Sequence, residues 1–245
     1  MLRAIRPASG SNKGEWAEEM TDRYVRLWHL LLPPSLYLAV QYLTELSFTM
    51  MAWGAADQRA AESVGVTSAV CIPAFIFLYL RWRTFPASRG QKADVSGDKN
   101  LSGYGRLALW CIAGAIAGMT LSAAWGALAN AVHLNRFFSD ASQRLYASQL
   151  WQQILFAGLL APVCEELLFR GLLFGALLNL SERERTAALL TSVLFALFHG
   201  NVIQMLYAFP TGLILQFLFC RGDSILPCVF FHIAANLTAV LVTAM

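Results

Sequence analysis

The chain has 245 residues, of which 57% are hydrophobic and 13% are charged, and its formal net charge is +3. Soluble proteins are about 45–50% apolar and about 25% charged, so this chain has too few charges to cover a water-facing surface. These values exclude soluble, disordered, fibrous and disulfide-scaffold proteins. The small net charge and the lack of a basic, aromatic-rich run argue against nucleic-acid binding. The sequence therefore predicts an all-α, polytopic membrane protein.

Apolar stretches alternate with polar segments along the chain. Most of these stretches are close to the ~20 residues that cross a ~30 Å hydrocarbon core. Residues 186–220 contain no Lys, Arg, Asp or Glu. Divided at Gly200 and Asn201 they form two short spans, and undivided they form one span with a re-entrant segment. We expect about seven transmembrane helices, with six to eight allowed, at residues 28–53, 64–82, 106–131, 149–180, 186–200, 202–220 and 225–244.

The cations predict the orientation of these helices. Of the 18 Lys and Arg residues, 14 lie in segments on the N-terminal side of the membrane and three on the opposite side. By the positive-inside rule, the N-terminus is cytoplasmic and the C-terminus lies outside. The expected divisions are a cytoplasmic N-terminal segment (1–27), two helices (28–82), a flexible cytoplasmic loop (83–105), a third helix with an outer loop (106–148) and a C-terminal group of helices (149–245).

The fourth expected span contains the remaining cation, Arg170, together with Glu165 and Glu166. A charged side chain at the centre of a membrane helix costs about 2.5–3.5 kcal/mol, so a functional explanation is the default. Glu166 and Arg170 are four residues apart and are predicted to form an ion pair on one helical face. Glu165 points about 100° away from Glu166 around the helix, which leaves it as an additional carboxylate without a local partner.

Two later spans supply further polar groups. His199 lies deep in the fifth span, and His232 and Asn236 lie one turn apart on one face of the last span. With a rise of ~1.5 Å per residue, Glu165 and His199 are about 20 Å from the cytoplasmic ends of their spans, His232 about 12 Å and Asn236 about 18 Å. Three helices therefore place polar groups at comparable depth, which predicts one polar cluster inside the bilayer.

This set of groups favours peptide hydrolysis. A carboxylate and an imidazole that face one cavity can hold and deprotonate a water molecule. A second imidazole and an amide N–H can stabilise an oxyanion. The combination suits attack of water on an amide carbonyl without a covalent enzyme intermediate and without a cofactor.

The same residues resemble the signature of the CPBP family of intramembrane proteases, which includes type II CAAX prenyl endopeptidases and bacteriocin-processing or self-immunity proteins. The family motifs are EExxxR, FxxxH and HxxxN. All three occur in order within about residues 149–240: Glu165-Glu166…Arg170, Phe195…His199 and His232…Asn236.

The resemblance implies a metal-independent glutamic endopeptidase in the inner or plasma membrane of a prokaryote, with residues 149–245 as its catalytic helices. Its partners would be the lipid bilayer and a membrane-anchored protein or peptide as substrate. The implied roles are water activation by Glu165 and His199, oxyanion binding by His232 and Asn236, and support by Glu166, Arg170 and Phe195.

Three alternatives stay open. Glu165, His199 and His232 form a valid ligand set for catalytic zinc, although the sequence lacks HExxH. Cys164 could act as a nucleophile, but an apolar neighbourhood disfavours the thiolate. A non-enzymatic transport or immunity protein could also use buried Glu, His and Arg, as proton relays do. Against that alternative, we expect no further buried charge in the first three spans and find no internal repeat.

Overall fold

The computed structural model describes residues 13–83, 101–131, 149–181, 183–200, 202–222 and 224–244. All regular secondary structure in these ranges is helical, which confirms the predicted all-α class. Six helices stand as single elements: α1 (Lys13–Met50), α2 (Ala56–Arg83), α3 (Leu101–Ala131), α8 (Glu184–Phe198), α9 (Val202–Gly222) and α10 (Leu226–Ala244).

The helix that carries Glu165 and Glu166 is a long rod in which α-helix alternates with π-helix. Its segments follow one another without a break: α5 (Leu150–Gln152), η2 (Gln153–Leu160), α6 (Ala161–Glu166), η3 (Leu167–Leu173) and α7 (Phe174–Ser181). The described residues therefore form seven helical rods in all. Stretches of π-helix occur often at functional sites, and here both glutamates lie on the short α-helical segment between two of them.

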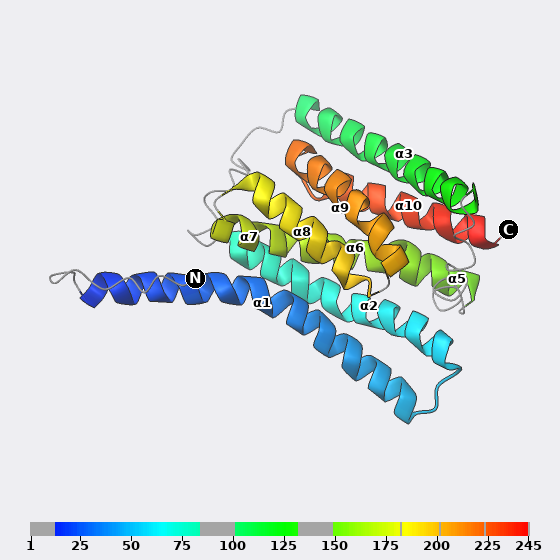
Figure 1. Ribbon diagram of the computed structural model, residues 1–245, viewed down its shortest axis with the longest axis horizontal. Helices are drawn as coiled ribbons and strands as arrows, with labels where there is room; N and C mark the ends of the chain where they lie inside the picture. The colour runs from blue at the N-terminus through cyan, green and yellow to red at the C-terminus, as the bar shows by residue number, and fades with distance from the viewer. Residues whose placement is uncertain are drawn as a thin grey trace.

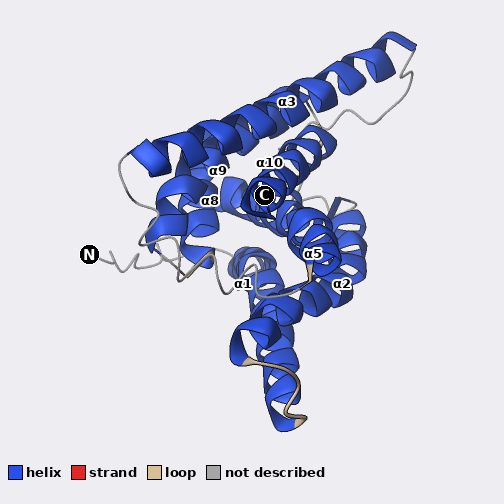
Figure 2. Cartoon of the chain, turned by 90° about the vertical axis from the view of Figure 1, so that its right-hand side faces the viewer, coloured by secondary structure: helices blue, strands red, loops and turns tan. Residues whose placement is uncertain are grey.

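The α5–α7 rod runs through the middle of the bundle (Figure 1). Its central segments contact α2, α10, α1 and α8. Helix α3 packs on α10, far from α1 and α2 (Figure 2). Because the rod touches four other helices, side chains that point from its different faces meet partners from different parts of the sequence.

Two glycines on α3 allow this helix to approach the backbone of α10. A Cβ atom at Gly114 would lie 2.6 Å from the carbonyl oxygen of Pro227, and one at Gly118 would overlap the carbonyl group of Phe231. Small residues four apart permit close packing of membrane helices. This contact fixes the position of α10, which carries His232.

The surface and the helix lengths are those of a membrane protein. Three helical segments are long and apolar enough to cross a bilayer, namely Glu62–Trp82, Tyr104–Ala131 and Gln204–Gly222, and Leu226–Val242 is a shorter apolar helix. Large apolar side chains are exposed over many of the described helices, among them Leu109 at 68% and Phe77 at 66%. Such a surface suits contact with lipid. The number of seven spans stays a prediction.

The expected division of residues 186–220 is confirmed, because α8 ends at Phe198 and α9 begins at Val202. Gly200 has φ +67°, a conformation that glycine adopts readily, and its N–H donates to the carbonyl oxygen of Leu197. This turn ends α8 and leaves His199 as the C-cap residue of the helix.

Two helices extend beyond the apolar stretches. Helix α1 begins within the expected segment 1–27, and α3 begins within the expected loop 83–105. Hydropathy marks where a helix is apolar, whereas backbone hydrogen bonding continues into polar sequence. Residues 84–100 and 132–148 of the expected loops lie outside the described residues.

Candidate active site

The predicted ion pair between Glu166 and Arg170 forms the centre of a buried cluster. The two side chains are fully buried, and Nη1 of Arg170 lies 3.0 Å from Oε1 of Glu166. Nη2 of Arg170 donates to the carbonyl oxygen of Gly212 on α9, also at 3.0 Å. The guanidinium therefore ties the α5–α7 rod to α9 and places a positive charge beside the carboxylate of Glu166.

His232 of α10 lies between the two glutamates. Its Nδ1 is 2.8 Å from Oε1 of Glu166, and its Nε2 is 3.8 Å from Oε2 of Glu165. Because an ionised carboxylate only accepts hydrogen bonds, this contact assigns a proton to Nδ1. Glu166 thus orients the imidazole so that its other nitrogen faces Glu165. Among the described residues, the imidazole that lies within 4.0 Å of Glu165 is that of His232, and the joint activation of water by Glu165 and His199 stays a prediction.

His199 joins the cluster through an aromatic ring. Its Nδ1 is 2.8 Å from the carbonyl oxygen of Phe195, which can only accept, so Nδ1 carries the proton of this hydrogen bond. Among the described residues, His199 forms no ion pair with a carboxylate within 4.0 Å. Its connection to the charged groups passes through Phe195.

The ring of Phe195 touches three of the predicted site residues. Its centroid is 5.0 Å from the ring of His199 and 5.7 Å from that of His232, and Cζ of Arg170 lies 4.6 Å from it. The side chain is 1% exposed. A cation over the face of an aromatic ring is stabilised by the ring quadrupole. Phe195 therefore holds α8 against the charged pair and spaces the two imidazoles.

Asn236 fixes α10 to the central rod. Its Nδ2 donates to the carbonyl oxygen of Ala157 in η2 at 2.9 Å. This bond uses one of the two N–H groups of the amide and leaves the other available. The structure thus brings Glu165, Glu166, Arg170 and His232 into direct contact, and connects His199 and Asn236 to their surroundings through backbone carbonyls.

Three atoms of the cluster are buried and have no hydrogen-bond partner among the described residues: Oε2 of Glu165, Oε2 of Glu166 and Nε of Arg170. Most buried polar atoms in proteins are hydrogen-bonded, and each exception requires an explanation. The side chain of Glu165 is 15% exposed, more than that of Glu166 or His232. Unused hydrogen-bonding capacity on a partly exposed carboxylate is suited to binding a reactant.

The expectation of no further buried charge in the first three spans is wrong. Glu62 on α2 is 5% exposed and accepts hydrogen bonds from Trp53 (2.6 Å), Gln58 (3.0 Å) and Gln152 (2.8 Å). We call these four residues the Glu62 clasp. Hydropathy started the second span at residue 64 and left Glu62 at its polar edge. The signal that could have indicated the clasp is the presence of glutamines in two separate segments of the sequence, at Gln58 close to Glu62 and at Gln152.

The described residues contain no group of three His, Cys, Asp or Glu side chains arranged to hold a metal ion. Glu165, His199 and His232, the alternative zinc ligands, are among the described residues and do not form such a group. Cys164 precedes the glutamates and is a fully buried free thiol.

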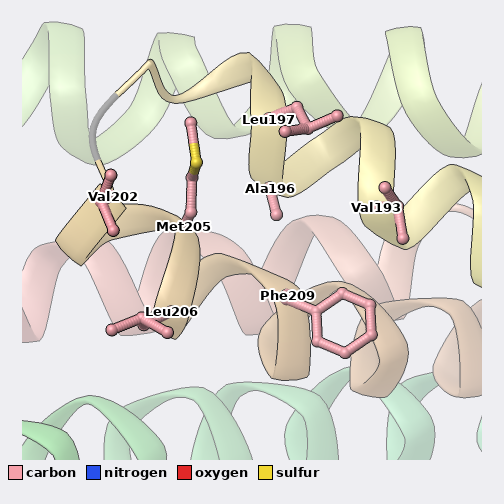
Figure 3. Close-up of a pocket in the computed structure, with 7 residues that line it drawn as sticks. All are labelled: Val193, Ala196, Leu197, Val202, Met205, Leu206 and Phe209. Atoms are coloured by element: carbon pink, nitrogen blue, oxygen red, sulfur yellow. The ribbon is translucent and has the colours of Figure 1, made fainter.

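A separate apolar groove of about 310 Å³ lies between α8 and α9 (Figure 3). It contains none of the predicted site residues. Its surface suits a hydrocarbon chain rather than a polar reactant, because its lining residues are Val193, Ala196, Leu197, Val202, Met205, Leu206 and Phe209.

Residues 147–238 match the family model of "Type II CAAX prenyl endopeptidase Rce1-like", and this range contains all three motifs. The resemblance to CPBP proteases is confirmed. The chain is also 23% identical over 223 residues to "Putative membrane peptidase YdiL" of Bacillus subtilis (strain 168), an alignment that covers 87% of this chain and 85% of that protein. No solved structure matches the chain. The chain is thus similar to one described membrane peptidase over most of its length and to the CAAX endopeptidase family model over its C-terminal helices.

Proposed function

We propose that the chain is a multi-pass intramembrane endopeptidase that hydrolyses a peptide bond of a membrane-associated protein or peptide. The observation that carries the proposal is the position of His232 between Glu166, at 2.8 Å, and Glu165, at 3.8 Å. Glu166 is paired with Arg170 and orients the imidazole. Glu165 is partly exposed, and its Oε2 has no hydrogen-bond partner among the described residues, which suits a general base.

In the proposed reaction, Glu165 removes a proton from a water molecule whose oxygen attacks the peptide carbonyl carbon. A C–O bond forms, the carbonyl oxygen becomes an oxyanion, and Glu165 holds the proton. When the C–N bond breaks, that proton passes to the leaving amine, and the products are an amine and a carboxylic acid, which then ionises by losing the second proton of the water. No covalent bond to the protein and no cofactor is needed.

The remaining predicted residues have complementary tasks in this proposal. Nε2 of His199 accepts a hydrogen bond from the attacking water. The second N–H of Asn236 and, when it carries a proton, Nε2 of His232 face the oxyanion. Donors that are already oriented stabilise an oxyanion more than donors that must reorganise. The contacts with Glu166 and with Ala157 are what orient these two side chains.

The finer topology is also part of the proposal. We assign the seven helical rods to seven membrane spans, with a cytoplasmic N-terminus and residues 149–245 as the catalytic helices. The 14-to-3 distribution of cations supports this orientation. Labelling of single cysteines placed at Arg183 and at Arg59, in a cysteine-free background, tests it, because the two positions are expected on the cytoplasmic and the outer side.

The decisive experiment uses the purified full-length chain in lipid nanodiscs. The substrates are a quenched-fluorescent farnesylated peptide ending in a CAAX sequence, the same peptide without the farnesyl group, and a membrane-anchored reporter whose linker spans the bilayer interface. The farnesylated peptide is chosen because the matching family is described as a prenyl endopeptidase. In parallel, membranes of cells that produce the wild type or Glu165→Gln are compared for uncleaved precursors.

We expect cleavage by the wild type and loss of cleavage in Glu165→Gln, with an unchanged melting temperature. The activity should survive chelators, and stoichiometric zinc with loss of activity on chelation would instead support the zinc protease. Full cleavage by a folded Glu165→Gln variant would refute the proposed mechanism.

A further inference from the structure

Gly212 of α9 lies at the candidate site but belongs to none of the three motifs. Its carbonyl oxygen accepts the hydrogen bond from Nη2 of Arg170 at 3.0 Å. The residue is buried in the interior of α9, where glycine is less favourable than alanine because it loses more backbone entropy on folding. A helical backbone does not require glycine, so the reason for glycine here lies in its surroundings.

The surroundings of Gly212 leave little room for a side chain. A Cβ atom on it would lie 3.2 Å from both Cα and Cβ of Ser192 and 3.3 Å from Cδ1 of Phe195. Both neighbours belong to α8 and are buried, Ser192 at 0% and Phe195 at 1% exposed. The backbone of α8 fixes the two atoms of Ser192, so no side-chain rotation can move them aside. The absence of a side chain at Gly212 therefore sets how closely α9 approaches α8.

This close approach determines where the Gly212 carbonyl meets the guanidinium of Arg170. Nη1 of Arg170 lies 3.0 Å from Oε1 of Glu166, while Nη2 lies 3.0 Å from the Gly212 carbonyl oxygen. The same Oε1 of Glu166 lies 2.8 Å from Nδ1 of His232. A guanidinium is a rigid planar fork, so its two acceptors are held at fixed relative positions. A shift of the carbonyl would turn the fork and reach the oxygen that orients His232.

We propose that Gly212 is a positioning residue of the candidate active site. Because it has no side chain, its carbonyl oxygen comes close enough to hold the guanidinium of Arg170. Arg170 in turn holds Glu166 and, through Glu166, the imidazole of His232. This inference rests on the proposed function. It gives α9, which carries none of the three motifs, a part in the chemistry of the central rod and α10.

The first test compares Gly212→Ala with the control Gly126→Ala, using the best substrate of the wild type. Gly126 lies within α3, where a Cβ atom would meet no neighbouring atom of the described residues within 4 Å. In Gly212→Ala the neighbours must give way by a few tenths of an ångström. A misplacement of about 1 Å can lower a rate about a hundredfold, so we expect kcat to fall about threefold to tenfold, with KM within about twofold. Gly126→Ala should leave both parameters unchanged.

A second variant tests the carbonyl group without adding a side chain. The α-hydroxy acid analogue of leucine at position 213 converts the peptide bond after Gly212 into an ester, whose carbonyl oxygen is a weaker acceptor. The control is the same replacement of Leu206, since each removes one backbone N–H from α9 and both side chains are exposed, Leu213 at 40% and Leu206 at 59%. Hydrogen bonds to charged groups are the stronger ones, so kcat should fall about threefold to tenfold with the ester at 213. The ester at 206 should leave kcat within about twofold of the wild type.

Two results would overturn the inference. A wild-type kcat with the ester at 213 would show that the bond from Arg170 to the carbonyl does not matter, and any loss in Gly212→Ala would then come from packing alone. A lower melting temperature with unchanged kcat in Gly212→Ala would leave the glycine a purely structural role.

The outcomes also separate this inference from the proposed function. If Glu165→Gln is inactive while Gly212→Ala and the ester at 213 keep the kcat of the wild type, only the role of Gly212 is refuted. If Glu165→Gln cleaves as the wild type does, the proposed function fails and the role of Gly212 fails with it.

Discussion

Two buried carboxylates of this bundle have opposite hydrogen-bonding states. Glu62 accepts from three side chains and uses both of its oxygens. Glu166 accepts from Arg170 and His232 through Oε1 alone, and its Oε2 has no partner among the described residues, like Oε2 of its neighbour Glu165. The first network is built from hydrogen bonds donated by neutral side chains, whereas the second contains a charged pair, a histidine and unused atoms.

The difference indicates what each network is for. A fully satisfied polar network makes the structure rigid and unique, whereas an incompletely satisfied one is costly to keep. The Glu62 clasp joins the start of α2 to the start of the α5–α7 rod through Gln152, so it holds the frame. The cluster at Glu165 keeps hydrogen-bonding capacity for a reactant at a cost in stability, which proteins accept at functional sites.

Substituting either of the two histidines is expected to have the largest effect, which is on kcat. We expect both His232→Ala and His199→Ala to lower kcat by about 10²–10⁴-fold, the usual contribution of an acid–base group. Only His232→Ala should also lower the free energy of unfolding, by about 1–3 kcal/mol, because Glu166 loses a donor. Among the described residues, the hydrogen bond of the His199 ring goes to a carbonyl oxygen of α8, one turn earlier. Equal losses of stability in the two variants, measured by unfolding in detergent, would contradict this distinction.

Substituting Arg170 is expected to have the next largest effect, which is on the free energy of unfolding. Arg170→Met leaves Glu166 buried without its counter-charge and should lower the free energy of unfolding by about 3–5 kcal/mol. Adding Glu166→Gln removes the unpaired charge and should recover part of that loss. Arg221 is the matched control, since its guanidinium is exposed at the end of α9 and lies 5.3 Å from the ring of Phe217. Arg221→Met should change stability by about 0.5 kcal/mol or less.

The helices and the ion pair followed from local sequence rules, whereas the contacts between distant segments did not. Spacing of four residues within one helix predicts that Glu166 and Arg170 meet, because helical geometry alone decides it. Whether His199 or His232 meets Glu165 depends on the turn at Gly200 and on the close approach of α3 to α10. Pairing of Gln152 with Glu62 spans 90 residues and depends on how α2 packs against the rod. No single-helix pattern encodes such a contact.

Substituting Glu62 tests whether the fully hydrogen-bonded carboxylate is structural rather than catalytic. Glu62→Gln places an amide NH₂ opposite donors from Trp53, Gln58 and Gln152, so at least one hydrogen bond is lost. The free energy of unfolding should fall by about 1–3 kcal/mol, while kcat stays within about twofold of the wild type. An inactive variant with unchanged stability would place Glu62 in the chemistry and remove the distinction between the two carboxylates.

The smallest expected effects come from the two glutamines of the clasp, which differ in what they connect. Gln152 donates to Glu62 from another rod, and its Oε1 also accepts from the backbone N–H of Gln149 at 2.9 Å. Gln58 donates to Glu62 from one turn away on the same helix. Gln152→Ala should therefore lower the free energy of unfolding by about 1–1.5 kcal/mol, and Gln58→Ala by about 0.5 kcal/mol, the value of a local pair. Thermal unfolding of both variants in one detergent measures the difference. If Gln58→Ala is the more damaging of the two, the clasp stabilises the start of α2 rather than the junction between the rods.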